Sequence, residues 1–352
     1  MFSQDPTIEE ARESLFEFYG VKAKSLKQLS SGKVNRSFLV ECPERGMLVL
    51  QFISPVFQKS PALGINWERA TRKLLDNNIP APSIIPALDG SLLYNGKGFE
   101  RLLRLTRFLE GASPAVGDLS EARACGKALG LAHTVLNTPR PLELVPLPAG
   151  VEYTNQRLPH SSDFSDFETL YRLHPKLSAI EGELERGARL AASLPGSPQF
   201  QRIFLLKDLV VHGDPKRDNF LGSGKSYSLI DWDTVSYGDP LLDLSELCRS
   251  LAVQKEPPLF NDELAREAVL GYQESGLCLP KSHFQHLTAT IRAIAITLAR
   301  RYLADSLLEN YFVWDKEHYP SHFEQDLTRA NALFDLSEEL LDREMELYNI
   351  CG

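Results

Sequence analysis

The sequence predicts an α+β protein in which a small sheet-rich N-terminal part precedes a larger helical part. Two observations support this fold class. Residues 36–42 and 46–53 are apolar, partly β-branched runs joined by a polar turn, which is typical of a β-hairpin. From Leu119 onward the chain consists mainly of long segments with helical periodicity. The length of 352 residues fits one large domain or two lobes that share a cleft.

Local signals define the N-terminal elements in order. The dipeptide Asp5-Pro6 opens a periodic segment that stops at Gly20, which is the pattern of a capped helix. After the hairpin, residues 66–77 have helical periodicity. That helix is expected to end before Pro80, because a proline disfavours helix in the residue before it. Two further strand-like runs follow, and the second spans residues 101–109.

The C-terminal part is predicted to contain long helices and two short strands. The helices are expected at residues 119–136, 166–173, 177–194, 262–274, 281–308 and 323–347. Short β-type runs stand at residues 209–211 and 227–230. We expect an N-terminal nucleotide-binding lobe of residues 1–110 and a C-terminal lobe of residues 111–352, with a hinge at about residues 107–114.

Composition limits the class of partner. The formal net charge of −9 argues against a protein that holds nucleic acid through its overall field. The N-terminus lacks a signal-peptide pattern, and no apolar stretch is long enough to span a bilayer. The five cysteines are scattered, and no pair has the spacing of metal ligands. We therefore expect a soluble cytoplasmic protein with a small-molecule substrate and no nucleic-acid or membrane partner, whose oligomeric state stays open.

The segment from His212 to Asn219 carries the strongest functional signal. It reads His-Gly-Asp-Pro-Lys-Arg-Asp-Asn, so Asp214 and Asn219 have the spacing of the base and the metal-binding asparagine in a kinase catalytic loop. Asp231 ends a later apolar strand, where a second metal ligand is expected. Phosphoryl transfer from ATP needs a carboxylate near the acceptor hydroxyl and oxygen ligands for Mg²⁺. Lys216 can reach the transferring group from the same loop. Aspartate and asparagine also cap turns, but the full set in this order favours catalysis.

The catalytic-loop pattern extends further along the chain. It continues as Ile-Asp-Trp-Asp at residues 230–233 and as Gly-Asp-Pro-Leu-Leu-Asp-Leu at residues 238–244. Together these three segments resemble the aminoglycoside phosphotransferase and choline kinase superfamily. The resemblance implies a protein-kinase-like fold with a small five-stranded lobe, a hinge and a larger helical lobe.

The resemblance also implies roles for single residues. Asp214 would be the catalytic base, and Asn219 and Asp231 would bind Mg²⁺. His212 would support the metal-binding strand. Asp243 would tie the helix that follows it to the catalytic loop.

A narrower resemblance concerns the acceptor. Four short matches are similar to N-acetylhexosamine 1-kinases: residues 214–216 with 230–235, 50–53 with 56–57, 301–305 with 311–312, and 327–330. Pro215 and Trp232 depart from the threonine and leucine of that pattern. The implied acceptor is the anomeric hydroxyl of an N-acetylhexosamine or a related sugar. An aminoglycoside, homoserine or choline-like alcohol stays open as the acceptor, and so does a catalytically silent nucleotide-binding pseudokinase.

Five N-terminal residues are candidates for binding the nucleotide. Gly32 stands in the turn where backbone N–H groups would contact phosphate, although a plain hairpin turn explains the glycine equally well. Lys33 and Asn35 would add side-chain contacts. Gln51 occupies the strand position of the usual phosphate-binding lysine, and Glu68 that of the carboxylate partner of this lysine. With a glutamine there, either a different cation contacts the phosphates, or the ATP is held mainly by Mg²⁺ and the backbone. The same glutamine is the one feature that supports the pseudokinase alternative.

The acceptor site is expected to use residues of the helical part. His160 lies in a loop-rich stretch and is a candidate for a polar contact with the substrate. Arg301 lies on an apolar helix, where a cation needs an anionic partner. A sugar or phosphate contact and an ion pair with Asp305 explain Arg301 equally well. His133, on a small-residue helix, is expected to be a packed core histidine.

Overall fold

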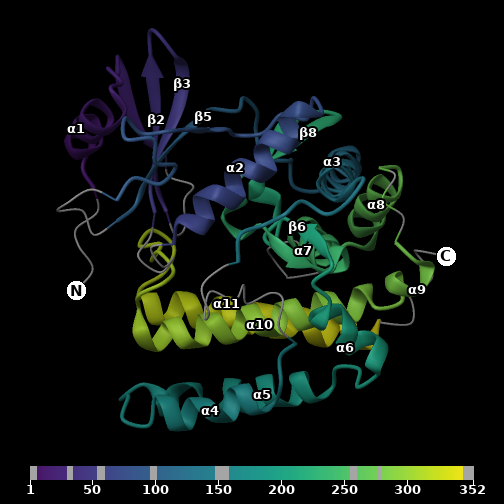
Figure 1. Cartoon of the computed structure of the whole chain (residues 1–352). Helices are drawn as coiled ribbons and strands as arrows, with labels where there is room; N and C mark the ends of the chain where they lie inside the picture. The colour runs from purple at the N-terminus through teal and green to yellow at the C-terminus, as the bar shows by residue number, and fades with distance from the viewer. Residues whose placement is uncertain are drawn as a thin grey trace. The chain divides into compact units, whose positions relative to one another are not determined.

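The chain forms two compact units (Figure 1). The computed structural model describes residues 6–29, 35–53, 60–95, 101–146, 158–253, 260–275, 277 and 279–343. The first unit comprises Met1–Glu110, Glu143–Val151 and Asn310–Val313, and the second comprises Gly111–Leu142, Glu152–Glu309 and Trp314–Gly352. The nucleotide-binding and acceptor-binding roles of the two parts stay predictions.

The first unit is built on a five-stranded antiparallel sheet. Its strands are β1 (Ser25–Leu29), β2 (Arg36–Cys42), β3 (Gly46–Phe52), β4 (Ile84–Ile85) and β5 (Leu103–Arg107), in the order β1-β2-β3-β5-β4. Cys42 pairs with Gly46 and Arg36 with Phe52, which confirms the predicted hairpin. Gly46 has a φ of 75°, a conformation that glycine adopts at little cost. The α+β class and the small antiparallel sheet are confirmed.

Two helices accompany this sheet, and both begin at a capping residue. Helix α1 (Ile8–Tyr19) starts at Thr7, whose side chain accepts a hydrogen bond from the N–H of Glu10 in a capping box. The predicted helix is present, but Thr7 caps it, and Asp5 lies outside the described residues. Helix α2 (Pro61–Asp76) starts at Ser60, earlier than residue 66, because a serine followed by proline is itself a helix start.

The core of the first unit forms where α1 meets one face of the sheet. Alternate residues of the hairpin point to that face, since side chains along a strand alternate between its two sides. Phe38, Val40, Leu48 and Leu50 are fully buried there with Leu15 of α1. The hairpin therefore supplies much of the apolar surface that holds this unit together.

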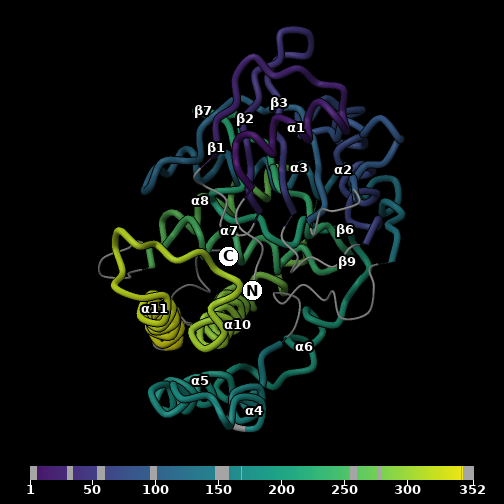
Figure 2. The backbone as a smooth tube through the Cα atoms, turned by 90° about the vertical axis from the view of Figure 1, so that its left-hand side faces the viewer, coloured from purple at the N-terminus to yellow at the C-terminus, as the bar shows by residue number. Residues whose placement is uncertain are grey.

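The second unit is mainly helical. Its helices are α3 (Leu119–Asn137), α4 (Ser162–Leu170), α5 (Glu181–Ala192), α6 (Pro198–Leu205), α7 (Pro240–Ala252), α8 (Asp262–Gln273), α9 (Lys281–Phe284), α10 (Leu287–Leu308) and α11 (His322–Asp342), with a 3-10 turn η2 (Leu177–Ile180) before α5. Helices α10 and α11 lie side by side (Figures 1 and 2). Helices α3 and α8 pack so closely that a Cβ at Gly126 would lie 1.9 Å from the carbonyl oxygen of Ala268.

Two helices of the second unit escaped the sequence prediction. Both α6 and α7 begin with a cap followed by proline, at Ser197 and at Asp239. Helix α7 is buried almost all round, and its buried residues include the polar Asp243, Ser245 and Glu246. Other predictions need adjustment: 166–173 is α4 at Ser162–Leu170, and 281–308 is divided into α9 and α10.

Four short strands organise the segment between α6 and α7. Strand β6 (Leu209–Val211) pairs with β9 (Ser236–Gly238), and β7 (Phe220–Ser223) pairs with β8 (Ser226–Leu229), both antiparallel. These two ladders position the loop between them. The strands expected at residues 209–211 and 227–230 are confirmed, whereas β7 and β9 were not predicted because each is short and rich in glycine and serine.

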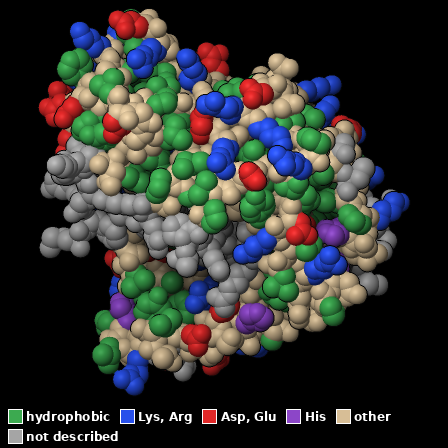
Figure 3. Space-filling model, viewed as in Figure 1, with side chains coloured by type: hydrophobic (Ala, Val, Ile, Leu, Met, Phe, Trp, Pro, Cys, Tyr) green, Lys and Arg blue, Asp and Glu red, His purple; other side chains and the backbone are tan. Residues whose placement is uncertain are grey.

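One face of the molecule carries described side chains of both charges. On the face shown in Figure 3, Lys and Arg side chains are interspersed with Asp and Glu. Among the described helices, none combines the length and the apolar character that crossing a bilayer requires.

Candidate active site

His212 fixes the start of the loop after β6. Its side chain is fully buried, and its Nε2 lies 3.0 Å from the carbonyl oxygen of Ile230. Because a carbonyl only accepts, Nε2 carries the proton, and Nδ1 then accepts the N–H of Asp214 at 3.3 Å. Burial lowers the pKa of His212, which favours this neutral form. The ring therefore joins the loop to the residue before Asp231, as the resemblance implied.

Asp214, Lys216 and Asn219 form one cluster in this loop. The ammonium group of Lys216 contacts Oδ2 of Asp214. Nδ2 of Asn219 donates to the backbone oxygen of Asp214 at 2.8 Å and to Oδ2 at 3.3 Å. Burial alone would lower the pKa of Lys216, but the carboxylates of Asp214 and Asp231 outweigh it and raise this pKa. Asp214, Lys216 and Asn219 are therefore in direct contact, and Asp231 lies close enough for its charge to act on Lys216.

Asp231 is held in an uncommon backbone conformation. Its φ of 63° and ψ of 63° are left-handed, which costs roughly 1 kcal/mol for a residue with a Cβ. It lies two residues after the end of β8 and immediately precedes a 3-10 turn, η4 (Trp232–Thr234). Strained conformations are often retained where a side chain must point in a specific direction. Asp231 is therefore a candidate functional residue on structural grounds as well.

Asp243 of α7 organises the backbone of the catalytic loop. Its Oδ2 accepts the N–H of His212 at 2.7 Å, and its Oδ1 accepts the N–H of Gly213 at 3.0 Å. The predicted link between the helix and the loop is thereby confirmed. Gly213 has a φ of 88°, and a Cβ there would lie 2.4 Å from the carbonyl oxygen of Thr234. Any side chain at this position would push the loop away from Thr234.

His133 completes the environment of Asp243. It is fully buried in α3, so the predicted core position is confirmed. Its Nε2 lies 3.0 Å from Oδ2 of Asp243, and its Nδ1 lies 2.8 Å from the hydroxyl of Tyr272. This contact with Asp243 was not predicted, because the two residues are 110 positions apart and no local pattern relates them. His133 acts on the loop through Asp243.

Electrostatic interactions connect the loop to α10. Arg249 of α7 forms an ion pair with Glu246 at 2.6 Å. Burial acts to lower the pKa of Arg249, but Glu246 and Asp214 are among the charges that raise it. Burial raises the pKa of Tyr302 on α10, while the charges of Arg249 and Arg301 act to lower it. Arg249 therefore lies close enough to both Asp214 and Tyr302 for its charge to act on each of them.

The two predicted acceptor contacts lie on other elements of the second unit. His160 is exposed and precedes α4, and its backbone N–H donates to Oδ2 of Asp163 at 2.8 Å. Arg301 is half-buried on α10. Asp305, the ion-pair partner considered for it, has its Oδ2 3.2 Å from Nε2 of His322. Substrate contacts by His160 and Arg301 stay predictions.

Gln51 lies within the first unit, beside a cation that sequence reasoning missed. Its Oε1 accepts two hydrogen bonds from Arg104, and its Nε2 donates to the hydroxyl of Ser37 at 3.3 Å. Arg104 is fully buried, and its guanidinium lies 3.6 Å from the ring centroid of Trp67. An arginine between two leucines of a predicted strand was the available signal. Nucleotide binding by Gln51 stays a prediction.

The remaining nucleotide candidates are less informative. Glu68 forms an ion pair with Arg72 of its own helix, α2. Asn35 is buried immediately before β2. Gly32 and Lys33 lie outside the described residues. Roles for these four candidates in binding nucleotide stay predictions.

The loop offers ligands that suit Mg²⁺. Since Nδ2 of Asn219 donates to Asp214, Oδ1 of the same amide points away from it. The carboxylate of Asp231 lies close enough to Lys216 to raise its pKa, so both oxygen donors belong to the same cluster. Amide and carboxylate oxygens are the ligand types that Mg²⁺ prefers. The donor set therefore fits a magnesium ion.

A family model identifies the chain by its sequence. The model described as the phosphotransferase enzyme family matches residues 25–276, which include the whole catalytic loop. No curated protein sequence is significantly similar to the chain.

Solved structures support the same fold. An amicoumacin kinase in complex with AMP-PNP and Ca²⁺ has a TM-score of 0.62 at 12% identity, covering 96% of this chain and 94% of that one. An aminoglycoside phosphotransferase from Alicyclobacillus acidocaldarius has a TM-score of 0.61 at 13% identity, covering 99% and 98%. A microcompartment-associated aminopropanol kinase has a TM-score of 0.61 at 16% identity, covering 96% and 98%. The chain therefore has the protein-kinase-like fold that the sequence predicted.

Proposed function

Because the chain belongs to the phosphotransferase enzyme family, we propose that it transfers the γ-phosphoryl group of ATP to a hydroxyl group of a small molecule. One observation gives the main support for this reaction. Lys216 and Asn219 contact the carboxylate of Asp214, and Asp231 lies close enough for its charge to act on Lys216. The similar amicoumacin kinase was solved with AMP-PNP and Ca²⁺, and a similar spectinomycin phosphotransferase was solved with ADP. These ligands support ATP and a divalent cation as cofactors.

Asp214 acts as the base in the proposed reaction. The acceptor oxygen forms a bond to the γ-phosphorus, the bond from this phosphorus to the β–γ bridging oxygen breaks, and ADP leaves. Asp214 accepts the proton of the hydroxyl. Asn219 keeps Asp214 oriented through one hydrogen bond to its carboxylate and one to its backbone oxygen.

Three other side chains would help to neutralise the negative charge of the phosphates. Lys216 stays protonated because Asp214 and Asp231 raise its pKa, so it brings a positive charge to the oxygens of the transferring group. Asn219 and Asp231 would hold Mg²⁺, which when bound neutralises charge on the β- and γ-phosphates.

For the acceptor we favour the anomeric hydroxyl of an N-acetylhexosamine or a related sugar. Support comes from the segment that begins with Arg301 on α10, next to Tyr302. Arg301 is half-buried there, and its guanidinium can donate hydrogen bonds to the oxygens of a neutral sugar, whereas it would repel a polycationic aminoglycoside.

Amine-bearing alcohols are the alternative acceptors. A choline/ethanolamine kinase family protein from Mesorhizobium loti has a TM-score of 0.54 at 17% identity, covering 97% of this chain and 98% of that one. The aminopropanol kinase described above points to the same class of acceptor. These names favour an alcohol whose amine would meet a carboxylate of the second unit.

An acceptor panel tests the proposal. ADP release is measured with Mg²⁺ and ATP against N-acetylhexosamines, an aminoglycoside, choline and homoserine, and products are assigned by ³¹P nuclear magnetic resonance. We expect ADP formation to depend on an N-acetylhexosamine and to give its 1-phosphate. If an amine-bearing alcohol is phosphorylated instead, the proposed phosphoryl transfer is correct but the proposed sugar acceptor is wrong. If no acceptor in any class raises ADP release while nucleotide binds, the chain is a pseudokinase.

A further inference from the structure

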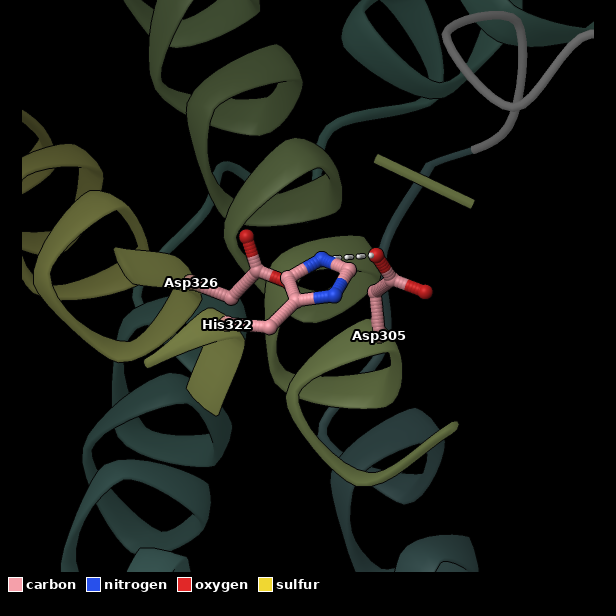
Figure 4. Close-up of side chains that lie close together, drawn as sticks. All are labelled: Asp305, His322 and Asp326. Carbon is pink, nitrogen blue, oxygen red and sulfur yellow. Dashed lines mark ion pairs between the residues drawn. The ribbon is translucent and has the colours of Figure 1, made fainter. Parts of the chain in front are cut away.

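A second cluster of titratable side chains lies apart from the catalytic loop, between α10 and α11 of the second unit (Figure 4). It consists of Asp305 near the end of α10 and of His322 and Asp326 near the start of α11. Asp305 is 2% exposed, His322 9% and Asp326 0%. Burying two carboxylates so completely is costly unless a cation accompanies them or one of them is protonated.

The three side chains point toward one another. Nε2 of His322 lies 3.2 Å from Oδ2 of Asp305 and 3.3 Å from Oδ2 of Asp326. One ligand atom from each residue lies within 4.8 Å of the others. Ligands that bind a tetrahedral Zn²⁺ at their usual bond lengths are separated from one another by about 3.3 Å. The distances from Nε2 of His322 to the two carboxylate oxygens therefore match the separation of ligand atoms in a tetrahedral zinc site.

The polar atoms at the centre of the cluster are poorly satisfied. Nε2 of His322 and Oδ2 of Asp326 are both shielded from solvent, and neither makes a hydrogen bond of good geometry with a described residue, although the carboxyls of Asp305 and Asp326 interact with each other. An N–H on Nε2 would lie in the ring plane and point in one direction only, whereas two carboxylate oxygens lie near this nitrogen. A cation among the three atoms would contact all of them at once.

The local structure holds two of these ligands in place. His322 and Asp326 are four residues apart on α11, so they share one face of the helix. The hydroxyl of Ser321 caps the first turn by accepting the N–H of Glu324 at 3.1 Å. Nε2 of Gln325 donates to Oδ1 of Asp326 at 3.2 Å, which leaves the other oxygen of that carboxylate directed at the cluster. Such orienting contacts are typical of metal ligands.

We propose that Asp305, His322 and Asp326 bind a divalent transition-metal ion, with Zn²⁺ the best suited, and that this ion fastens α10 to α11. One imidazole nitrogen with two carboxylates suits zinc, whereas Mg²⁺ prefers oxygen ligands alone. A water molecule would complete four-coordination. The ion would be structural and separate from the magnesium held by Asn219 and Asp231, so this site does not depend on which acceptor is phosphorylated.

Zinc titration of the metal-free, nucleotide-free protein tests the site. Calorimetry should show one tight equivalent of Zn²⁺, and thermal unfolding should shift to higher temperature with Zn²⁺ but not with the same concentration of Mg²⁺. Asp326→Asn and His322→Gln should weaken zinc binding by about tenfold or more. His318→Gln is the matched control, because His318 also pairs with a carboxylate, Asp315, but is exposed. Unchanged zinc affinity in both ligand variants, or loss of the tight equivalent in the control, would overturn the proposal.

A second measurement needs no variant and so does not depend on how the variants fold. X-ray absorption at the zinc edge of the parent protein should show a first shell of nitrogen and oxygen atoms at about 2.0 Å with a single imidazole. A shell that contains sulfur, or two or more imidazoles, would place the zinc elsewhere. Failure of the parent to retain any zinc would also reject the site, whatever the outcome of the acceptor panel.

Discussion

Arg104 donates two hydrogen bonds to Gln51, from Nε at 3.0 Å and from Nη2 at 2.8 Å, both to Oε1. Strands β3 and β5 place the two residues directly opposite each other in the sheet. The neutral amide at the position of the usual lysine is therefore matched to a buried arginine. A lysine and this arginine would be two cations facing each other across one strand pair.

Gln51→Lys is expected to destabilise the protein by about 2 kcal/mol or more, because it sets a second cation against the buried Arg104 and removes its acceptor. Urea unfolding measures the change in free energy. Gln28→Lys on β1 is the matched control, since that glutamine is exposed on the same sheet. Equal stability of the two variants would show that Arg104 does not need the amide.

Asp214→Asn should lower turnover by about 10²–10⁴-fold while folding and nucleotide binding persist, because only the acceptor hydroxyl needs a base. Initial rates of ADP release with the best acceptor measure the effect. Asp218→Asn tests the same change in the same loop at a side chain that is 48% exposed, and it should keep near-parental turnover. Near-parental turnover by the Asp214 variant would exclude this residue as the base.

Asp231→Ala should weaken binding of Mg²⁺-ATP far more than binding of metal-free ATP, because a carboxylate ligand acts through the ion. Calorimetric titrations with ATP in Mg²⁺ and in chelator separate the two. If both affinities fall equally, the carboxylate affects the nucleotide without the metal, and its assignment as a magnesium ligand is wrong.

Arg301→Ala should reduce kcat/KM for the sugar by about 1–3 kcal/mol of transition-state stabilisation, since a lost contact leaves polar groups of the substrate unpaired. Acceptor-free hydrolysis of ATP serves as the internal control and should barely change. Should both activities fall together with an earlier thermal transition, Arg301 supports the helix and does not contact the sugar.

His283 links stability to pH through Asp239, the residue that caps α7. Nε2 of His283 lies 3.0 Å from Oδ2 of Asp239, and this hydrogen bond raises the pKa of His283 above its ordinary value of about 6.5. The folded state therefore binds the proton more tightly, so the contribution is full below about pH 6.5 and is lost as pH rises through the raised pKa. Unfolding free energies of the parent and of His283→Gln, measured from pH 5.5 to 8.5, should converge as pH rises. Divergence would contradict the pairing.

The parts of the fold that were predictable are those encoded within short stretches of chain. The hairpin of β2 and β3 follows from two apolar runs and a turn, and the spacing of Asp214 and Asn219 lies within a single loop. Helix α7 was missed, although the cap at Asp239 followed by Pro240 is itself a helix-start signal.

The parts that were not predictable depend on residues far apart in the chain. Arg104 meets Gln51 only because β5 aligns with β3, and His133 meets Asp243 only because α3 packs near α7. The cluster of Asp305 with His322 and Asp326 likewise needs the end of α10 to face the start of α11. Register and helix packing decide these contacts, and neither can be derived from local pattern alone.

The contacts of Asp243 have a consequence for engineering. The geometry of the reacting loop is set by α3, α7 and the two short β-ladders, through one carboxylate that accepts two backbone N–H groups. Under the proposed function, acceptor choice is exerted from α10 and from the stretch before α4. A library that randomises exposed positions there, and leaves His133 and Asp243 untouched, should yield variants that change their preferred alcohol and still cleave ATP. Acceptor specificity can thus be changed while the catalytic loop keeps its geometry.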